Sequence, residues 1–495
     1  MKTDDLTCTG QCTKPSQWPA RALTSLALVG LLAGCAVGPD FKRPEAPTTS
    51  NYTVATMPAQ TASAAILLGE VQTLRVGREV SLEWWHSLGS SRLDALIALA
   101  LQNSPTLASA KSTLLQAQEL HAAQAGSTRY PQVDANIGAQ RQRMSPSGLG
   151  LAGDAREFSL YNASVGVHYR LDLAGGNRRA LEALAARVDY RSHELAGAQL
   201  TLAANITTTA IVRAKLAGQL AATKAMVEAQ DEQINVTRER VRFGQAAPDE
   251  LLAQQTQTEQ TRSGLPLLLK QLQQSEHLLA TLSGQAPGDA KVPDFTLAEF
   301  KLPTELPLVM PSDLVRRRPD IQAAEALLHA ANAEYGVAIA KLYPQINLSA
   351  NLGSQALTTG ALFGGNSAVW SVLGQLTQPL FNPGLPAEKR ASLAALDAAA
   401  ENYQGVVLDA LRNVADTLSA LEHDALSSLA FADSTAQSSL ESTGRQYALG
   451  AASYTQLLIA RQQAQQSSIA LVAAQAQRLA DSAALFQAMG GGYDG

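Results

Sequence analysis

The chain has little of several things that would place it in a common class of protein. Charged residues make up only 16% of its 495 residues and aromatic residues only 5%. Lys and Arg number 38 against 43 Asp and Glu, with no basic patch or tail, so nothing predicts nucleic-acid binding. No window after residue 35 offers 18 consecutive apolar residues, so the sequence predicts no transmembrane helix there. This composition favours long helices packed through small side chains.

Cysteine is also scarce, and all three copies lie near the start, as Cys8, Cys12 and Cys35. Arg21 precedes an apolar stretch from Ala22 to Leu32, which is typical of a secretory leader. The stretch ends in Leu32-Ala33-Gly34-Cys35, which resembles the lipobox at which bacterial lipoproteins are cut and acylated. We expect residues 1–34 to be a lipoprotein signal peptide and Cys35 to be the lipidated residue. An ordinary leader with a chance cysteine is the alternative, and a later true start codon stays open because the leader is long.

The residue after Cys35 is Ala36, where lipoproteins held at the inner membrane tend to carry Asp. The resemblance to lipoproteins therefore implies the outer membrane. With no transmembrane helix expected, a lipid anchor combined with membrane strands is the remaining route into a bilayer.

Residues that carry chemistry are not clustered. The histidines are scattered, without a His-Glu-x-x-His motif or a pair at metal-ligand spacing: His86, His121, His168, His193, His277, His329 and His423. Gly364-Gly365 lies in a loop between predicted strands rather than before a phosphate-binding helix. We therefore expect no catalytic, cofactor-binding or metal site, and no enzyme.

A repeat is the most informative feature that is present. Three groups of residues recur in the same order: Tyr130-Pro131-Gln132 as Tyr343-Pro344-Gln345, Phe243-Gly244 as Leu449-Gly450, and Leu251-Leu252 with Gly284 as Leu457-Leu458 with Gly490. The last two groups are separated by one constant offset. The sequence therefore predicts a tandem duplication of a helix–strand–strand–helix unit of about 200 residues.

Each copy contains two stretches in which apolar and polar residues alternate. The apolar members are Val133, Ala135, Ile137 and Ala139, then Ala163, Val165, Val167 and Tyr169, and in the second copy Ile346, Leu348, Ala350 and Leu352, then Trp370, Val372 and Leu376. Each stretch is about ten residues long, the length of a tilted membrane strand. We expect β-hairpins at about 131–171 and about 345–380; soluble hairpins are the alternative.

Long stretches without proline flank these strands. They predict helices from about Gly176 to Arg242 and from about Pro386 to Ala448. Pro105 should divide an earlier helical stretch in two, and Pro266 should kink a later one. Residues 37–77, rich in Pro, Thr and Ala, read as an extended linker.

Each long helix should end in a tight turn. Gly244 and Gly450 suit the left-handed position after a helix end. Pro248 suits the first turn of the helix that follows, and Ser453 with Gln456 should form a capping box. These turns are the points of the chain that lie farthest from the strands.

Four strands cannot close a barrel, because membrane barrels begin at eight strands. An open edge in lipid leaves backbone groups unsatisfied, at several kcal/mol each. The sequence therefore predicts a homotrimer with a twelve-stranded barrel and a long α-helical coiled-coil barrel beneath it, mainly α with membrane β.

Several motifs of the chain resemble those of a known protein family. These motifs are Arg317-Arg318-Pro319-Asp320-Ile321, Ala324-Glu325, Tyr343-Pro344-Gln345-Ile346, Trp84-Trp85, Leu171-Asp172-Leu173 and Gln378-Pro379-Leu380-Phe381-Asn382. Across nearly the whole mature chain, the sequence resembles the TolC-like outer membrane efflux family. The lipobox makes it most similar to the NodT-type lipoprotein branch.

The resemblance implies a passive exit duct for drugs or other small molecules, with no cofactor and no chemistry. It would sit in the outer membrane and extend through the periplasm, joined to a periplasmic adaptor protein and an inner-membrane efflux pump. A duct for protein export and a structural coiled-coil lipoprotein are the rival interpretations. The first shares the fold, and the second does not explain the alternating strands.

In that family the helix turns close the tunnel and meet the adaptor. Carried over, the gate and adaptor-contact residues are Phe243, Gly244, Asp249, Glu250, Leu251, Tyr447, Gly450, Tyr454, Gln456 and Leu457. Asp249 and Glu250 would form a threefold acidic ring, or act only as favourable charges at a helix start. The second turn has Ala452, Gln456 and Ile459 where relatives carry charged gate residues, so closure is expected to depend on Tyr447, Tyr454 and leucine packing.

The expected organisation follows from these features. It comprises a signal peptide at 1–34, a lipid-anchored linker at 35–90, a first efflux-protein repeat at 91–290, a connection at 291–312 and a second repeat at 313–495.

Overall fold

The computed structural model describes residues 36–491, apart from 55–57, 146–149, 151 and 433–434. Cys35 and the leader lie outside the described residues. The chain divides into two compact units. The first contains residues 121–183 and 331–396 with the N-terminal residues up to 41, and the second contains 42–120, 184–330 and 397–495.

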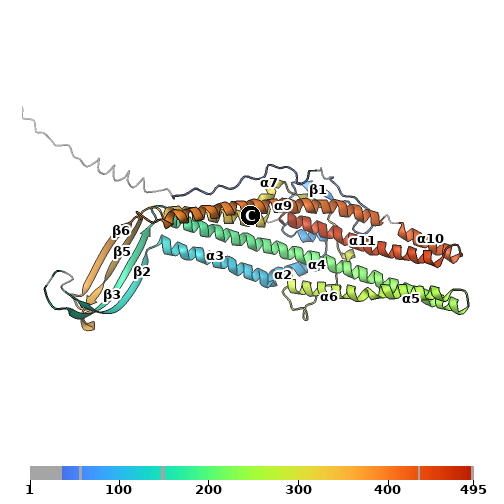
Figure 1. Ribbon diagram of the computed structural model, residues 1–495, viewed down its shortest axis with the longest axis horizontal. Coiled ribbons are helices and arrows are strands. Elements are labelled where there is room, and N and C mark those ends of the chain that lie inside the picture. The colour runs from blue at the N-terminus through green and yellow to red at the C-terminus, as the bar shows by residue number, and fades with distance from the viewer. Residues whose placement is uncertain (1–35, 55–57, 146–149, 151, 433–434, 492–495) are drawn as a thin grey trace, which may run out of the picture. The chain divides into compact units, whose positions relative to one another are not determined.

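The first unit is built on a four-stranded antiparallel sheet. Its strands follow the order β2-β3-β5-β6, with bounds β2 Gln132–Met144, β3 Arg156–Leu171, β5 Gln345–Ala356 and β6 Ala368–Thr377 (Figure 1). All four predicted strands are confirmed, and each of the first three is longer than the ten residues expected. Residues of the second hairpin pair directly with the first, because β3 and β5 are neighbours.

The register of the sheet gathers the alternating residues onto two faces. One row across the four strands consists of Val133, Val167, Ala350 and Val372, and the next row consists of Asp134, Gly166, Asn351 and Ser371. One face is therefore largely apolar and the other polar. The polar face borders an open hollow whose lining includes His168, Arg170, Asn347 and Gln375.

The apolar face ends where charged residues appear. Arg141 and Arg143 both reach Glu157 on the neighbouring strand, at 3.3 and 3.9 Å. Within the apolar band large side chains face outward, with Ile137 88% and Trp370 77% exposed. A face of exposed apolar side chains on a sheet with membrane-length strands is typical of a surface that faces lipid.

The edge strands β2 and β6 have no strand partner on their outer sides among the described residues. Every residue of β6 is exposed, as is nearly every residue of β2. The single chain therefore presents two rows of unpaired backbone groups at the sides of the sheet.

Helices dominate the rest of the chain. Their bounds are α2 Ser91–Asn103, α3 Pro105–Arg129, α4 Gly176–Arg242, α5 Pro248–Ser263, α6 Leu265–Leu282, α7 Pro311–Arg317, α8 Pro319–Ala340, α9 Gly384–Ala432, α10 Ala436–Ala448 and α11 Tyr454–Ala488. The break at Pro105 and the extent of α4 agree with the sequence. On α9, Val414, Leu418 and Leu421 follow one another at steps of four and three residues and are buried.

One predicted helix was wrong in detail. The helix expected from Pro386 to Ala448 is divided, because α9 ends at Ala432 and α10 begins at Ala436. Thr435, the residue just before α10, lies in a turn, and threonine is a weak helix former. The kink expected at Pro266 is confirmed, because α5 and α6 are joined by the single residue Gly264, whose backbone is in the right-handed helical region.

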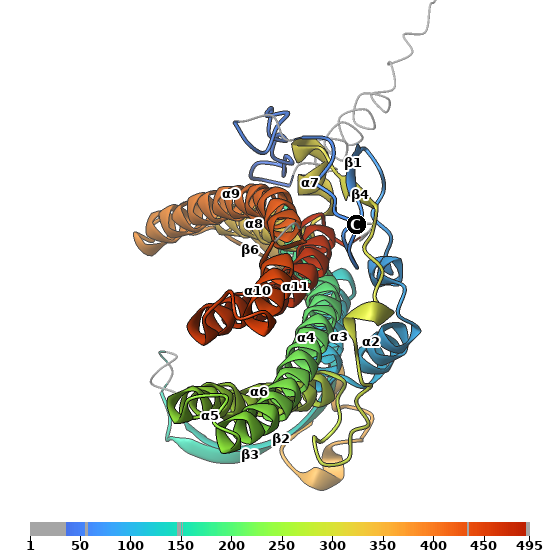
Figure 2. The same cartoon turned by 90° about the vertical axis from the view of Figure 1, so that its right-hand side faces the viewer.

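The segment that reads as a linker also takes part in the second unit. Strand β1 (Thr73–Val76) pairs in parallel with β4 (Glu305–Leu308), which lies in the expected connection (Figure 2). The Gln72 side chain donates to the carbonyl of Pro303 and to the Ser482 hydroxyl, at 2.9 and 2.8 Å. Each strand has only four residues, too few to show a period in the sequence.

Three single-turn 3₁₀ helices complete the described elements: Trp84–Leu88, Leu297–Glu299 and Thr359–Ala361. Trp84 is 1% exposed and stacks on Phe486 of α11, with ring centroids 5.5 Å apart. Part of α4 is long and apolar enough to cross a membrane, but half of that window is buried in the protein. A buried core helix has the same composition, so α4 gives no separate indication of a membrane span.

Candidate functional site

The candidate site lies in the second unit, at the turn between α4 and α5 and the turn between α10 and α11. Both turns have the same backbone geometry. Gly244 and Gly450 have φ angles of 68° and 76°, in the left-handed region. The next amide reaches back to the carbonyl of Arg240 in one turn and of Gln446 in the other, each at 2.8 Å. This is the Schellman arrangement, in which glycine avoids the cost of a Cβ atom.

The helices that leave the turns begin differently. Helix α5 has Pro248 in its first turn, and its N-cap Ala247 offers no side-chain hydrogen bond. Helix α11 begins with the predicted capping box: Gln456 N donates to Ser453 Oγ at 3.3 Å, and Ser453 N donates to Gln456 Oε1 at 2.7 Å. The first turn therefore relies on proline and acidic charge, and the second on a reciprocal hydrogen-bond pair.

Tyr447 joins the two turns. Its hydroxyl accepts a hydrogen bond from Arg240 Nη1 at 3.0 Å and donates one to Glu250 Oε1. The Arg240 guanidinium also lies 5.7 Å from the centre of the Tyr447 ring. A single phenol thus links the last turn of α4, the first turn of α5 and the end of α10.

A second tyrosine packs beside the first. The rings of Tyr447 and Tyr454 lie 5.8 Å apart in an edge-on arrangement. Burial and the hydrogen bond to Glu250 raise the pKa of Tyr447, and burial raises that of Tyr454 to about 12. Both phenols therefore stay protonated at neutral pH. Tyr454 differs in one respect, because its buried hydroxyl has no hydrogen-bond partner among the described residues.

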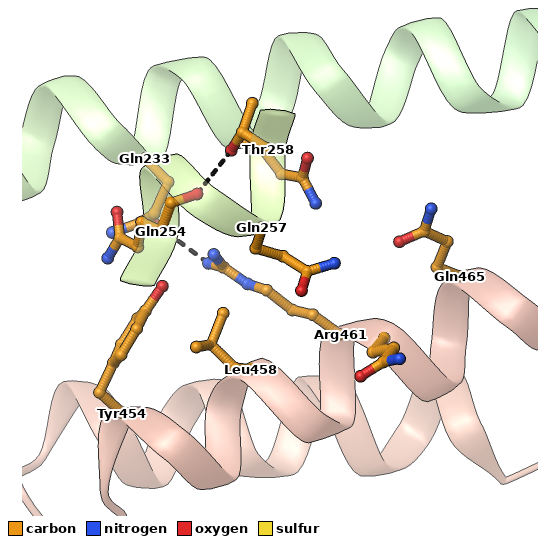
Figure 3. Close-up of a pocket in the computed structure, with 10 residues that line it drawn as sticks. Gln233, Gln254, Gln257, Thr258, Tyr454, Leu458, Arg461 and Gln465 are labelled. Atoms are coloured by element: carbon orange, nitrogen blue, oxygen red, sulfur yellow. Dashed lines mark hydrogen bonds between the residues drawn. The ribbon is translucent and has the colours of Figure 1, made fainter. Parts of the chain in front are cut away.

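The Tyr454 hydroxyl borders a small polar hollow between α4, α5 and α11 (Figure 3). Its volume is ≈ 20 Å³, enough for about one water molecule. Arg461 crosses it from α11 and donates to Gln233 Oε1 at 3.2 Å. Glutamines make up most of the lining, and Gln254 donates to Thr237 at 2.8 Å on the side of α4. The helices near the turns therefore meet through polar side chains rather than through a leucine core.

The predicted site residues are not all brought together. Glu250, Tyr447 and Tyr454 share the contacts above. Asp249 is exposed and makes no ion pair with any described residue, Leu457 is 3% exposed, and Leu251 is half-buried. Phe243 and Leu449 stand 66% and 84% exposed at matching places in the two turns.

Sequence reasoning missed the cations of this site. Arg240 lies one turn before Gly244, and Arg461 lies two turns into α11. A basic residue in the last turn of a helix is common because it favours the helix dipole, so Arg240 gave no specific signal. Only the tertiary pairing of the turns reveals what these two arginines contact.

Comparison with known proteins supports a channel assignment. A model described as outer membrane efflux protein matches residues 96–285 and 310–491. The chain is 28% identical over 491 residues to outer membrane protein OprJ of Pseudomonas aeruginosa, covering 96% of this chain and 97% of that protein. It is 29% identical over 481 residues to the probable efflux pump outer membrane protein TtgC of Pseudomonas putida, covering 96% of each. The solved outer-membrane channel OprN has a TM-score of 0.83 at 25% identity, covering 93% of this chain and all of that one.

Proposed function

The chain belongs to the outer membrane efflux protein family, and from this premise we propose how three copies form its passage. The protein is an efflux channel of the outer membrane, and its relatives are channels rather than enzymes. The proposal concerns its assembly, its anchor, its partners and its closing contacts.

The four-stranded sheet is the observation that carries the proposal. It has an apolar face, a polar face and two unpaired edges. In a bilayer those edges must be paired, and membrane barrels have at least eight strands. Three copies joined β6 to β2 form a closed ring of twelve strands, with the polar faces inward around a wet lumen.

Internal duplication explains why two hairpins lie in one chain. The family model matches twice, once over each half. The helix ends at Gly284 and Gly490 repeat the geometry of Gly244 and Gly450, each with a left-handed glycine and an amide that reaches back five residues. Gly284 and Gly490 are separated by the same number of residues as Gly244 and Gly450, which supports a tandem repeat.

The anchor and partners complete the assembly. Acylation of Cys35 after removal of residues 1–34 places a lipid on the first residue of the mature chain, and the three anchors add to the hold of the barrel. The two turns are the parts that meet a periplasmic adaptor, which joins the channel to an inner-membrane pump. Cargo is carried passively, as drug-sized molecules moving out through the lumen.

We assign closure to the contacts of Tyr447. The Arg240–Tyr447–Glu250 contacts tie the two turns of one subunit together without a direct ion pair between them. Breaking these contacts frees α10 and α11 to move apart from α4 and α5. Exposed Phe243 and Leu449 are the apolar contacts offered to neighbouring subunits or to the adaptor.

The assembly can be tested by linking sheet edges. Ile137→Cys in β2 and Trp370→Cys in β6, joined by a flexible bis-maleimide in detergent, should give a ladder that ends at three chains. The mature chain has no other free cysteine if Cys35 is acylated. Val167→Cys with Ala350→Cys, on the paired strands β3 and β5, is the matched control and should link only within a chain.

The same preparation should conduct ions in planar bilayers. A water-soluble monomer that needs no detergent would contradict the channel, and a ladder that continues beyond three chains would contradict the closed ring.

A further inference from the structure

Residues 36–40 lie in the first unit between the start of α4 and helix α8, which together form a groove around them. The Val37 amide donates to the Ala174 carbonyl at 3.0 Å, in the turn that joins β3 to α4. Asn332 of α8 donates through Nδ2 to the Pro39 carbonyl at 3.0 Å. Both ends of this short strip are therefore held by hydrogen bonds.

Arg179 holds the middle of the strip. Its guanidinium donates to the carbonyls of Val37 and Gly38, at 3.4 and 3.3 Å, and to Asp40 Oδ1 at 2.6 Å. Glu182 accepts from its remaining nitrogen at 2.7 Å. Arg179 is only 4% exposed. A buried arginine is costly unless its donors are satisfied, so the strip supplies what Arg179 requires and the arginine fixes the strip.

Three glycines leave room for this close approach. A Cβ on Gly175 would lie 2.5 Å from the Ala36 Cα, and a Cβ on Gly38 would lie 2.8 Å from the Gly336 Cα. A Cβ on Gly336 would lie 2.9 Å from Arg179 Cγ. Backbone thus packs on backbone at Ala36 and at Gly38, which a loosely attached terminal segment would not require.

We propose that this groove is the binding site for the acylated N-terminus of the mature chain, with Arg179 as its positioning residue. The inference rests on the proposed acylation of Cys35. Five free residues would let an anchor roam about 17 Å, at roughly 3.4 Å per residue. With residues 36–40 bound, Ala36, which follows the proposed lipid-bearing residue in the chain, is held against the turn that follows β3. The lipid then enters the bilayer at a set place beside the sheet.

The experiment places a nitroxide spin label on the strip. The label is attached to Pro39→Cys, at an exposed residue of the strip, in full-length protein processed in an outer membrane and purified in detergent. The expected spectrum is that of an immobilised label. Arg179→Met, which keeps the length but loses every donor, should cause loss of the immobilised component.

Matched variants separate positioning from general damage. Arg178→Met removes the neighbouring arginine, which is 51% exposed and pairs loosely with Asp172 at 3.9 Å, and should leave the spectrum unchanged. Gly336→Ala displaces Arg179 without changing charge and should also mobilise the label. Gly126→Ala, at a helical glycine with open space around it, should not.

Two outcomes would overturn the inference. One is a label that is mobile in the unmodified background or stays immobilised in both Arg179→Met and Gly336→Ala. The other is a mature protein whose first residue, by mass spectrometry, is not an acylated Cys35. Neither depends on conductance: a channel that conducts while the label test fails retains the proposed function and loses only the anchor site.

Discussion

The two helix turns are alike in backbone and unlike in side chains. Gly244 and Gly450 give both turns the same left-handed residue and the same pair of returning hydrogen bonds. The first turn then contributes acids and the second contributes tyrosines, so that Glu250 meets Tyr447. The helix ends therefore determine where the two turns lie. The side chains that differ between the turns form the contact that joins them.

The two halves also differ along the helices, at positions distant in sequence from the turns. Asp424 on α9 and Asp481 on α11 are the second-half equivalents of Gly218 and Ser275, because the same offset in sequence separates Gly244 from Gly450. Asp481 is 5% exposed, and its Oδ2 has no partner among the described residues. Burial, reinforced by the neighbouring Asp424 carboxylate, raises the pKa of Asp481 to about 7, although Gln477 donates to its other oxygen at 2.8 Å.

The largest expected effect is that of Asp481→Ser, which gives the second half the serine that the first half has at Ser275. The folded protein keeps a proton on Asp481 that the unfolded chain has lost above about pH 4. Stability should therefore fall as pH rises from about 4 to about 7 and stay low above that. Asp481→Ser should remove this slope and raise the free energy of unfolding at pH 8 by on the order of 2–4 kcal/mol. Thermal unfolding in detergent at pH 5 and pH 8 measures it.

Ser275→Ala is the control for this measurement, since it alters the matching position in the first half and carries no charge. The measured quantity is the stability gain of Asp481→Ser over the parent protein at each pH. A gain at pH 8 that is no larger than the gain at pH 5 would contradict the buried proton.

The next effect compares the two tyrosines. Tyr447→Phe loses hydrogen bonds to two charged partners and should weaken the contact between the turns by about 2 kcal/mol. Tyr454→Phe removes a buried hydroxyl without a described partner, so it should cost nothing and stabilise by up to about 1 kcal/mol. We expect Tyr447→Phe to raise single-channel conductance in planar bilayers and Tyr454→Phe to leave it unchanged.

Acid variants sharpen this comparison. Glu250→Gln should behave like Tyr447→Phe in part, whereas Asp249→Asn, at an exposed residue, should have a smaller effect. Equal conductance increases for both acids would favour the threefold acidic ring over the Tyr447 contact.

The smallest effect exchanges the helix caps. Ala247 and Ser453 occupy matching positions, with φ and ψ of −75° and 143° in one and −77° and 157° in the other. Ser453→Ala should destabilise by about 1 kcal/mol, and Ala247→Ser should stabilise by up to about 1 kcal/mol. Thermal unfolding of the two single variants and the double variant measures these changes. If the two turns are interchangeable, the double variant should be about as stable as the parent. A stability loss for Ala247→Ser would mean that the turns differ in more than their side chains.

Much of the fold could be predicted from local patterns. The alternation of apolar and polar residues predicted the four strands, and Pro105 predicted a helix break. The bounds expected for α4 also agree with the structure. The paired turns and the capping box at Ser453 also follow from short-range rules, because a left-handed glycine and a Ser-x-x-Gln motif act within one turn of the chain.

Features that depend on distant partners could not be predicted. Strands β1 and β4 are short and lie far apart in sequence, so neither gives a periodic signal. Arg240 and Arg179 look like ordinary helix charges until the fold brings Tyr447 to one and Val37 and Gly38 to the other. The end of α9 at Ala432 could not be predicted from proline, because that stretch of the chain contains none.

The unpaired sides of β2 and β6 bear on how such a channel is made in the cell. A lone subunit pushed into hydrocarbon would expose both rows of amides and carbonyls, at several kcal/mol for each group. If the channel is the proposed trimer, newly exported chains must find two companions before, or while, they enter the bilayer. The rate of channel assembly should then rise steeply with the concentration of subunits, and a shortage should leave unassembled precursors for proteases rather than partial pores.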